Sequence, residues 1–335
     1  GKRETVESED GRLFLEFVRV VRDLRPRWFL FENVKGLLLS GTTIVGSRCS
    51  VCGKQSLVSF NDRQAYLDGE PRILPCSCGN ATPTLFDESR KGGSLDIIRS
   101  EFDSLGYKTY QTVLNAADFG APQTRERVII VGSRDGENFD WPLPTHGLGP
   151  TAQKQGAFDF LPKRKPWRSM FDALWAKGHP TFGKLDPETA VLRVKNVVRP
   201  HAEPVTWSLS RPSPTIGAHQ AAKLAIAPDG VPEAQLRRQQ WHLKGHRQGD
   251  LPPVFVKHEY LSDLELLTLQ AFPSGWYLYG TRMQRAFQIG NAVPVTLGHA
   301  IGKAIMSAMS ASASGHSDAI GKVTPHERRN AASIF

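Results

Sequence analysis

The amino-acid sequence predicts an α/β fold with a second, smaller lobe of irregular structure. Two stretches show a helical pattern followed directly by a short apolar strand, one near the start of the chain and one from Ser94 onward. Residues 135–258 differ from both, because they are rich in Pro, Gly, His and Trp and show little sustained periodicity. Helix and strand patterns in this order indicate an α/β domain, and a chain of 335 residues exceeds the usual size of one domain.

Composition narrows the class of protein. Apolar residues make up 40% of the chain, which is enough for a sizeable core. No apolar stretch approaches the roughly 20 residues of a membrane span and no secretory signal opens the sequence, so we expect a soluble protein. The excess of 42 Lys and Arg over 33 Asp and Glu gives a net charge of +9, which favours a polyanionic partner. The first residue is Gly, so we also expect further sequence upstream.

The first predicted helix and strand place an acidic side chain at a strand end. Asp10 is a candidate N-cap for a helix over residues 12–23, whose apolar positions recur at helical spacing, and Pro26 ends it. The stretch Trp28–Gly36 then reads WFLFENVKG, and its apolar run favours a strand buried on both faces of a parallel sheet, although a buried helix fits the same pattern. Ligands of open α/β sheets bind just beyond the carboxyl ends of strands, so Glu32 stands where an acid can act on a ligand. Capping of the following turn is the alternative for this residue.

Residues 40–93 interrupt the α/β pattern and contain every cysteine of the chain. The cysteines form a C-x-x-C pair and a tighter C-x-C pair about two dozen residues apart, each followed by glycine. Paired turns of this kind suit four thiolates around a tetrahedral zinc ion, and four reduced thiols in a surface insertion are the alternative. Zinc also explains how so polar a stretch folds, because it contributes about 10–16 kcal/mol to small modules. The candidate ligands are Cys49, Cys52, Cys76 and Cys78.

From Ser94 the helix and strand pattern resumes. Ser94 is a candidate cap for a helix that ends at Gly106, and a strand follows over residues 108–114. The segment Phe119–Arg127 then leads into a buried strand over residues 128–131. Alternate residues of an extended segment share a face, so the pattern predicts recognition of a flat or anionic group, with solvated arginines at a strand end as the alternative. The side chains on this face are Gln123, Arg125 and Arg127.

Residues 135–258 are predicted to form the second lobe. Basic residues cluster at Lys163–Lys165 and Arg237–Arg247, and the stretch Arg211-Pro-Ser-Pro-Thr215 lies midway. Interleaved basic residues and Trp suit contacts with the grooves and phosphates of a nucleic acid. A solvated basic surface is nearly as compatible with this composition.

The α/β pattern returns in residues 259–306. Ser262-Asp-Leu-Glu265 is a capping box that opens a helix. The stretch Phe287–Pro294 reads FQIGNAVP, and its proline fits the first turn of a last helix that ends at about Met306. Residues 307–335 are rich in Ser and Ala and then basic, a composition that predicts disorder.

Taken together, these stretches resemble the DNA cytosine carbon-5 methyltransferases. The resemblance covers about residues 1–134 without the cysteine insert, and residues 259–306. It implies a partial doubly wound, Rossmann-like methyltransferase sheet and a smaller, irregular target-recognition lobe, and the cysteine spacing adds a zinc-ribbon-like insert. The matching motifs, in the order of that family, are Glu32-Asn33-Val34 after a buried strand, Gln123-x-Arg125-x-Arg127 entering a strand, L-x-x-L-Q-x-F-P at Leu266–Pro273, and Gly290-Asn-x-Val-Pro294. The opening Gly1-Lys2-Arg3 with Asp10, Arg12 and Phe14 resembles the region that follows the catalytic loop of that family.

The resemblance also divides the chain into parts. It implies a catalytic domain over residues 1–39 and 94–134, a DNA target-recognition domain over 135–258 and a return to the catalytic domain over 259–306. Cysteine spacing and composition add a four-cysteine, zinc-ribbon-like insert over 40–93 and a disordered tail over 307–335. Because the sheet is incomplete, we expect an exposed apolar edge.

The chemistry of the family explains why these residue types belong together. A cysteine thiolate adds to carbon-6 of cytosine, and this addition requires a proton or a strong hydrogen bond at the ring N3. The resemblance assigns this proton and the choice of cytosine to Glu32, with Asn33 beside it. It assigns contact with the ring O2 to Arg127, with Arg125 and Gln123 next to it. The methyl group comes from S-adenosylmethionine after the base has left the duplex. The implied cofactor contacts are Asn291 and Ala292, at the edge of that site, and the candidate DNA contacts are Arg211 and Thr215.

The chain departs from the family in one large way. The Pro-Cys catalytic loop and the glycine-rich turn for S-adenosylmethionine belong before Gly1, and neither is present. Pro75-Cys76 is rejected as the nucleophile, because it follows the Glu32 strand and Cys76 pairs with Cys78. We therefore expect the C-terminal part of a methyltransferase, inactive alone and completed by the N-terminal part of the same enzyme or by a complementary subunit.

Double-stranded DNA is the expected substrate, without a membrane partner. The expected location is the bacterial cytoplasm, at the nucleoid, in a restriction-modification setting. Two alternatives remain from the sequence: a non-catalytic, zinc-bearing DNA-binding subunit of a split enzyme, and cytosine-5 methylation of tRNA.

Overall fold

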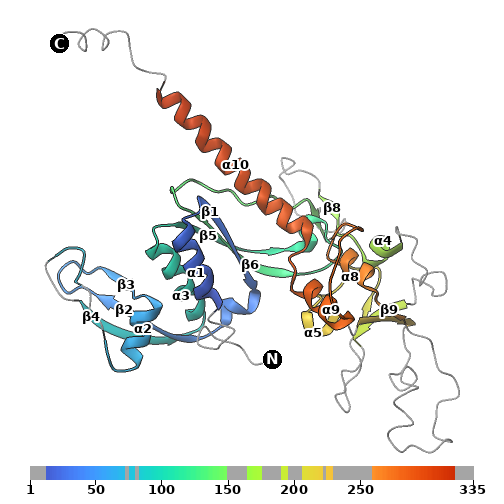
Figure 1. The fold of residues 1–335 in the computed structure, drawn as a ribbon, viewed down its shortest axis with the longest axis horizontal. Coiled ribbons are helices and arrows are strands. Elements are labelled where there is room, and N and C mark those ends of the chain that lie inside the picture. The colour runs from blue at the N-terminus through green and yellow to red at the C-terminus, as the bar shows by residue number, and fades with distance from the viewer. Residues whose placement is uncertain are drawn as a thin grey trace, which may run out of the picture. The chain divides into compact units, whose positions relative to one another are not determined.

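In the computed structural model the chain divides into two compact units (Figure 1). The first contains Gly1–Leu114, Arg127–Trp141 and Ala304–Phe335, and the second contains Asn115–Glu126 and Pro142–Lys303. The structure describes residues 13–71, 75–79, 83–148, 164–175, 190–194, 206–221, 224–228 and 259–320. The predictions that lie outside the described residues concern Gly1-Lys2-Arg3, Asp10 and Arg12, Lys163, the cluster Arg237–Arg247 and the tail from residue 321.

A three-stranded sheet forms the centre of the first unit (Figure 1). Its strands are β1 (Trp28–Val34), β6 (Glu126–Ser133) and β5 (Lys108–Asn115), in that order. β1 and β6 are antiparallel, with Trp28 opposite Ser133 and Val34 opposite Arg127. The predicted strand at Trp28 is therefore confirmed, but its predicted parallel pairing is wrong within the described sheet. The structure shows a mixed α/β fold with small sheets, and the doubly wound arrangement stays a prediction.

Two helices cover one face of this sheet, α1 (Leu13–Leu24) and α3 (Gly93–Ser104) (Figure 1). α1 follows the predicted range within one residue at each end. α3 begins earlier than predicted, because its N-cap is Gly92 with φ 81°, and Ser94 lies buried in the first turn with its Oγ 3.0 Å from Ser40 Oγ. The core between helices and sheet contains Phe14, Val18, Val21, Phe29, Phe31, Ile98, Phe102, Val128 and Ile130.

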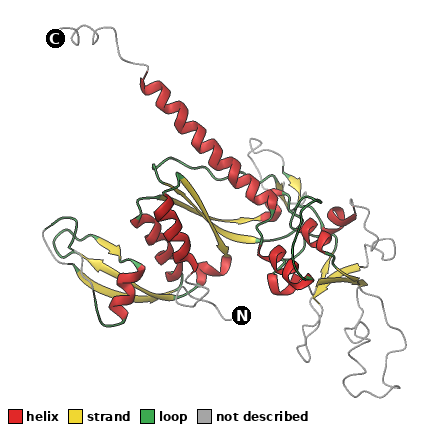
Figure 2. Cartoon of the chain, in the orientation of Figure 1, coloured by secondary structure: helices red, strands yellow, loops and turns green. Residues whose placement is uncertain are grey.

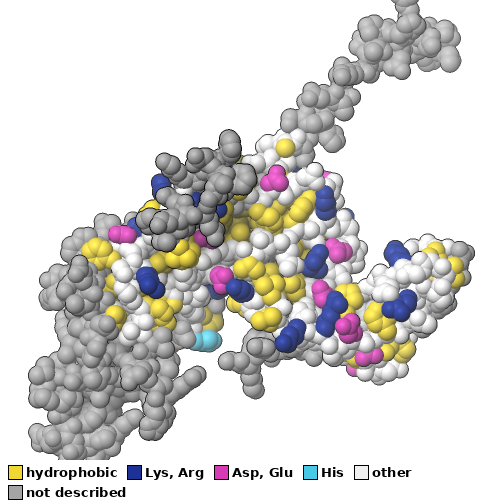
Figure 3. Space-filling model, turned by 180° about the vertical axis from the view of Figure 1, so that it is seen from behind, with side chains coloured by type: hydrophobic (Ala, Val, Ile, Leu, Met, Phe, Trp, Pro, Cys, Tyr) yellow, Lys and Arg dark blue, Asp and Glu magenta, His cyan; other side chains and the backbone are white. Residues whose placement is uncertain are grey.

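β1 is buried on one face only, which corrects the expectation of burial on both. Phe29 and Phe31 are 6% and 7% exposed, whereas Leu30 and Val34 are 36% and 53% exposed. Among the described strands, β1 stands at the edge of the sheet. The space-filling view shows hydrophobic side chains exposed in groups between charged ones on one face of the molecule (Figure 3).

The cysteine-rich stretch forms a second sheet within the first unit. The 3-10 turn η1 (Lys35–Leu39) connects β1 to β2 (Thr42–Arg48), and β3 (Gln55–Leu57), α2 (Phe60–Leu67) and β4 (Thr84–Arg90) follow. The strand order is β3-β2-β4, and both pairs are antiparallel. α2 begins at the N-cap Ser59, whose side chain accepts a hydrogen bond from the N–H of Asp62.

The second unit has its own core and its own sheet. A four-stranded sheet in the order β10-β9-β11-β12 shows that the lobe predicted to be irregular contains regular structure. The capping box at Ser262 and Glu265 is confirmed at the start of α8. The core packs Met170, Leu192 and Ile226 against Leu266 and Ile289. The elements are η2 (Ala116–Phe119), β7 (His146–Gly147), β8 (Lys165–Pro166), α4 (Met170–Trp175), β9 (Ala190–Val194), β10 (Thr206–Ser208), α5 (Ala218–Ala221), β11 (Leu224–Pro228), β12 (Glu259–Tyr260), α8 (Asp263–Leu269) and α9 (Arg282–Asn291).

The last helix, α10, extends from Val295 to Ile320 (Figure 2). Pro294 directly precedes it, as the sequence predicts. The helix continues well beyond the predicted end near Met306, into the stretch whose composition predicts disorder, and the disordered tail over 307–335 stays a prediction. Within the described part of the chain, no helix combines the length and apolar character that crossing a membrane requires.

Candidate functional site

Glu32 and Arg127 form an ion pair in the first unit. Glu32 lies near the end of β1 and Arg127 near the start of β6, and the antiparallel register places these two ends side by side. Arg127 Nε is 2.8 Å from Glu32 Oε1. The roles predicted for Glu32 and Arg127, on the same ring, require the two groups to be neighbours. The structure places them together, and their roles stay predictions.

This pair lies in largely dry surroundings. The side chain of Arg127 is 9% exposed and that of Glu32 is 21% exposed. Burial lowers the pKa of Arg127, and the nearby carboxylate of Glu32 partly opposes this shift. An acidic and a basic group side by side can accept and donate hydrogen bonds, which suits the polar edge of a heterocycle.

Asn33 supports the turn that follows the strand. Its side-chain Oδ1 accepts a hydrogen bond from the N–H of Val34 at 2.8 Å. Val34 is the last residue of β1 and directly precedes η1, so the amide of Asn33 supports the end of the strand, two residues after Glu32.

Gln123 and Arg125 are buried in the second unit, where they contact main-chain groups. Gln123 is fully buried, and its amide donates to the carbonyl of Leu269 at 3.3 Å and accepts from the N–H of Ile216 at 3.1 Å. Arg125 is 2% exposed and donates through Nη1 to the carbonyl of Ile216 at 3.0 Å. Both side chains thus fix distant segments of the chain, and direct contact of either with a ligand stays a prediction.

The predicted DNA contacts Arg211 and Thr215 belong to a segment that is hydrogen-bonded to residues 122–124. Both residues are exposed. Thr215 Oγ1 donates to the carbonyl of Thr124 at 2.9 Å, and Thr124 N–H donates to the carbonyl of Ser213 at 2.8 Å. The segment is therefore attached along one side to residues 122–125, with Arg211 at its exposed end.

Sequence reasoning missed Ser213, which is completely buried and pairs with Gln123 in a parallel bridge. A signal for it was present in the sequence. Pro212 and Pro214 lack N–H groups, so the N–H of Ser213 is the donor that this stretch can offer to a neighbouring strand. It donates to the carbonyl of Pro122 at 2.9 Å.

Asn291 and Ala292 lie at the end of α9 in the second unit. Asn291 is exposed, and Ala292 caps the helix with its N–H bonded to the carbonyl of Gln288 at 3.1 Å. The preceding Gly290 is required by close packing, because a Cβ there would lie 2.4 Å from the Cα of Ala218. The backbone is thus fixed on one side, and the amide of Asn291 is available to a polar ligand.

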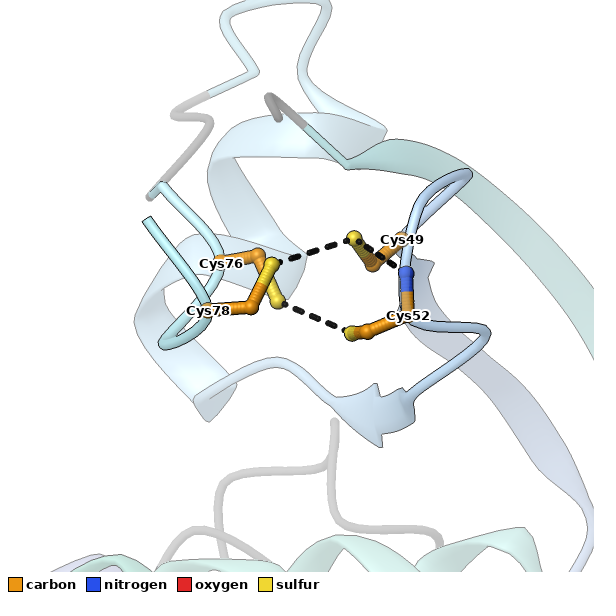
Figure 4. A group of neighbouring side chains, drawn as sticks. All are labelled: Cys49, Cys52, Cys76 and Cys78. Atoms are coloured by element: carbon orange, nitrogen blue, oxygen red, sulfur yellow. Dashed lines mark hydrogen bonds between the residues drawn. The ribbon is translucent and has the colours of Figure 1, made fainter. Parts of the chain in front are cut away.

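The four cysteines converge in the first unit (Figure 4). Two turns face each other, and the sulfur of Cys49 is 3.7 Å from that of Cys78, while the sulfur of Cys52 is 3.6 Å from that of Cys76. All four sulfur atoms lie within 4.8 Å of one another. A tetrahedral ion with metal–sulfur bonds of about 2.3 Å requires sulfur separations of about 3.8 Å, so the cluster has the geometry to bind a metal ion.

The protein environment shifts the pKa values of Cys49 and Cys52 in opposite directions. The main-chain N–H groups of Cys52 and Val51 lower the pKa of Cys49 to about 6. The N–H of Lys54 lowers the pKa of Cys52, but the sulfurs of Cys49 and Cys76 outweigh it and raise that pKa to about 11. A thiolate therefore forms readily at Cys49 near neutral pH, and a cation bound between the sulfurs would favour deprotonation of Cys52 beside it.

Comparisons with known proteins agree on one family. The family model described as C-5 cytosine-specific DNA methylase matches residues 1–45 and 85–307. Over 199 residues the chain is 31% identical to the Type II methyltransferase M.AquIA of Picosynechococcus sp., a match that covers 59% of the chain and 61% of that protein. Over 310 residues it is 25% identical to the Type II methyltransferase M1.HphI of Haemophilus parahaemolyticus, which covers 91% of the chain and 64% of that protein.

The chain thus spans about three fifths of the length of these two curated relatives. Among solved structures, a mutant of DNMT2 from Spodoptera frugiperda is similar with a TM-score of 0.43 and 14% identity, over 88% of the chain and 71% of that structure. Glu32, Arg127 and Asn291 fall within the residues that match the family, whereas the four cysteines fall in the unmatched interval.

Proposed function

The chain belongs to the family of C-5 cytosine-specific DNA methylases, and from this premise we propose that it supplies the base-binding acid of a DNA cytosine-5 methyltransferase. The observation that carries the proposal is the ion pair of Glu32 and Arg127, with 2.8 Å between Oε1 and Nε. In the proposed reaction a cytosine leaves the duplex, at a cost of a few kcal/mol, and its Watson–Crick edge meets this pair.

The two side chains divide the recognition of the base between them. Glu32 hydrogen-bonds or protonates the ring N3 and accepts from the exocyclic amine, which selects cytosine. Arg127 donates a hydrogen bond to the ring O2 and stabilises the negative charge that develops in the ring. Before a base arrives, the two groups form an ion pair, so neither is left as an isolated buried charge.

S-adenosylmethionine is the proposed methyl donor, and it supplies an electrophilic methyl group when bound. Asn291 and Ala292 would hold one edge of it, since the amide of Asn291 is exposed at the end of α9. The tight packing of Gly290 on Ala218 supports this assignment, because it keeps the backbone at that edge in one position.

The proposed reaction also needs a thiolate nucleophile. All four cysteines of the chain lie in one cluster, with every sulfur within 4.8 Å of the others. We therefore assign the nucleophile to a polypeptide segment other than the one described, either the N-terminal part of the same enzyme or a complementary subunit. The chain alone is expected to be inactive in methyl transfer.

Zinc is the proposed ion of the cysteine cluster. Four thiolates with sulfur separations of 3.6 Å and 3.7 Å across the two turns support a closed, structural site. Metal analysis of the purified protein should give one equivalent of zinc, lost in Cys49→Ser. Freshly purified, reduced protein without zinc would overturn this assignment.

Reconstituted methyl transfer tests the main proposal. The chain is combined with the product of the coding sequence directly upstream, and labelled S-adenosylmethionine is supplied with duplex DNA or with tRNA. Glu32→Gln should lower the rate by about 10²–10⁴, the usual share of a general acid. Arg127→Ala should raise the activation free energy of methyl transfer by about 1.5–3 kcal/mol, as for loss of a hydrogen bond to a charged group. Asp135→Asn, which changes an exposed carboxylate of the same unit, is the control and should leave the rate unchanged.

Near-normal turnover by Glu32→Gln would reject the assignment of the acid. Transfer to tRNA but not to duplex DNA would favour the alternative substrate. DNA binding without methyl transfer would favour a non-catalytic, zinc-bearing DNA-binding subunit, which the net charge of +9 also supports. Because the curated relatives are bacterial Type II methyltransferases, a restriction-modification setting in the cytoplasm, at the nucleoid, belongs to the same proposal.

A further inference from the structure

The four cysteines lie in an insertion whose two ends meet on neighbouring strands. The family model leaves residues 46–84 unmatched. In the antiparallel pair of β2 and β4, Val45 is opposite Asp87 and Ser47 is opposite Leu85. The chain therefore leaves the family pattern and rejoins it at adjacent points of one β ribbon. We refer to residues 46–84, which include β3, α2 and both cysteine turns, as the cysteine module.

The cysteine module contributes to the hydrophobic core of the first unit. Phe60, at the start of α2, is 5% exposed, and its ring lies 5.7 Å from that of Phe14 in an edge-on arrangement. Its main-chain N–H donates to the carboxylate of Glu101 in α3 at 2.5 Å. One residue of the module thus contacts both helices that cover the central sheet.

Arg63 attaches α2 to β2. This side chain is 1% exposed, and its Nε donates to the carbonyl of Thr43 at 2.5 Å while Nη2 donates to Thr42 Oγ1 at 3.2 Å. β2 follows β1 after the short turn η1, so α2 also anchors the strand that comes next in the chain after the one with Glu32.

Little within α2 itself keeps this helix in place. It has eight residues, fewer than the roughly 12–15 at which isolated helices are marginally stable in water. Cys52 precedes it and Cys76 follows it in the chain, on the two turns whose sulfurs face each other. An ion held by both turns binds the folded arrangement of this segment and not the unfolded chain, so its binding favours the folded position of α2.

We propose that metal binding by the four cysteines completes the core of the unit that carries Glu32, so that the ion stabilises α1, β1 and α3 as well as the cysteine module. This inference rests on the proposed zinc occupancy and not on the proposed methyl transfer. The ion acts through Phe60 and Arg63, at a distance from any substrate, and it is not catalytic.

The test measures amide hydrogen exchange of the full chain, in reducing buffer, with and without metal. Zinc is removed with a chelator and then restored at a free concentration of about 100 times its Kd. Mass action then lowers the unfolding equilibrium constant of every segment coupled to the site by about 100-fold. We expect exchange of the amides in α1, β1 and α3 to slow by about this factor, together with those of α2.

Three variants locate the coupling. Cys52→Ser should abolish the visible absorption that Co²⁺ gives in a four-thiolate site, and with it the effect of metal on exchange. Val51→Ala, in the same turn, is the matched control, because this side chain is 61% exposed and carries no ligand; it should keep both. Phe60→Ala should keep the Co²⁺ absorption but reduce the effect of metal on α1 and α3 at least tenfold.

Two results would overturn the inference. In the first, metal slows exchange only within residues 46–84 and leaves α1, β1 and α3 unchanged. In the second, the reduced protein gives no thiolate absorption with Co²⁺, which removes the zinc assignment as well. Neither result bears on the methyl-transfer assay, so the two proposals fail separately.

Discussion

The ion pair of Glu32 and Arg127 should stabilise the first unit measurably, because both side chains are largely buried. Two unit charges whose centres are about 4 Å apart attract each other by about 4 kcal/mol at an effective dielectric constant of 20. Removal of both groups from water offsets much of this attraction, since their side chains are only 9% and 21% exposed. The expected net coupling is about 1.5–3 kcal/mol, the range for hydrogen bonds to charged groups.

A double-mutant cycle measures this coupling in the chain alone, without any partner. The variants are Glu32→Gln, Arg127→Met and the double substitution, and the free energy of unfolding is obtained by denaturant titration. A second ion pair in the same unit provides a matched control: Arg134 Nε is also 2.8 Å from Asp135 Oδ1, but these side chains are 37% and 46% exposed. The control cycle should give less than about 0.5 kcal/mol. Equal couplings for the two pairs would refute the argument from burial.

Three further predictions concern the second unit, and denaturant unfolding measures each. Gln123→Leu removes an amide that is hydrogen-bonded to two main-chain groups, and we expect a loss of about 2–4 kcal/mol from the groups left unpaired. Gly290→Ala places a Cβ 2.4 Å from the Cα of Ala218 and should cost about 1–3 kcal/mol, whereas Gly298→Ala, with open space around it, should be neutral or stabilising by up to about 1 kcal/mol. Ser262→Ala removes the N-cap of α8 and should lower the free energy of unfolding by about 0.5–2 kcal/mol. Unchanged stability of the Ser262 variant would contradict the capping role, and unchanged stability of the Gly290 variant would contradict the close packing on Ala218.

Local patterns predicted the elements of the first unit well. The helical spacing of Phe14, Phe17, Val18 and Val21 predicted α1, and all of these except Phe17 are its buried residues. The end of α3 was also predicted, because Gly106 with φ 79° takes the left-handed position that closes a helix. The start of α3 was missed, since Gly92 supplies a left-handed N-cap in place of a side-chain cap. Short-range signals of this kind depend only on neighbouring residues, and the sequence contains all of them.

Strand pairing was harder to predict, because it depends on residues far apart in the chain. The apolar run at Trp28 predicted a strand but not its partner, and the observed partner β6 lies beyond the whole cysteine-rich stretch and α3. A run of apolar residues also overstated burial, since Leu30 on the second face of β1 is 36% exposed. Patterns of period two report which residues share a face, whereas coverage of that face is decided by other segments.

The three polar residues that alternate along one strand show where spacing stops being informative. Gln123, Arg125 and Arg127 share a face in an extended chain, and from the sequence all three were candidates for recognition of one ligand. In the structure the first two are hydrogen-bonded to the main chain of Ile216, and Arg127 is paired with the carboxylate of Glu32. Main-chain carbonyls and N–H groups are present at every residue and leave no mark in the sequence, so a buried polar side chain that binds them cannot be told from one that binds a ligand. A carboxylate partner is visible in the sequence, but Glu32 and Arg127 were assigned to a common site by the resemblance to a family, which placed Asn33, Arg125 and Gln123 beside them.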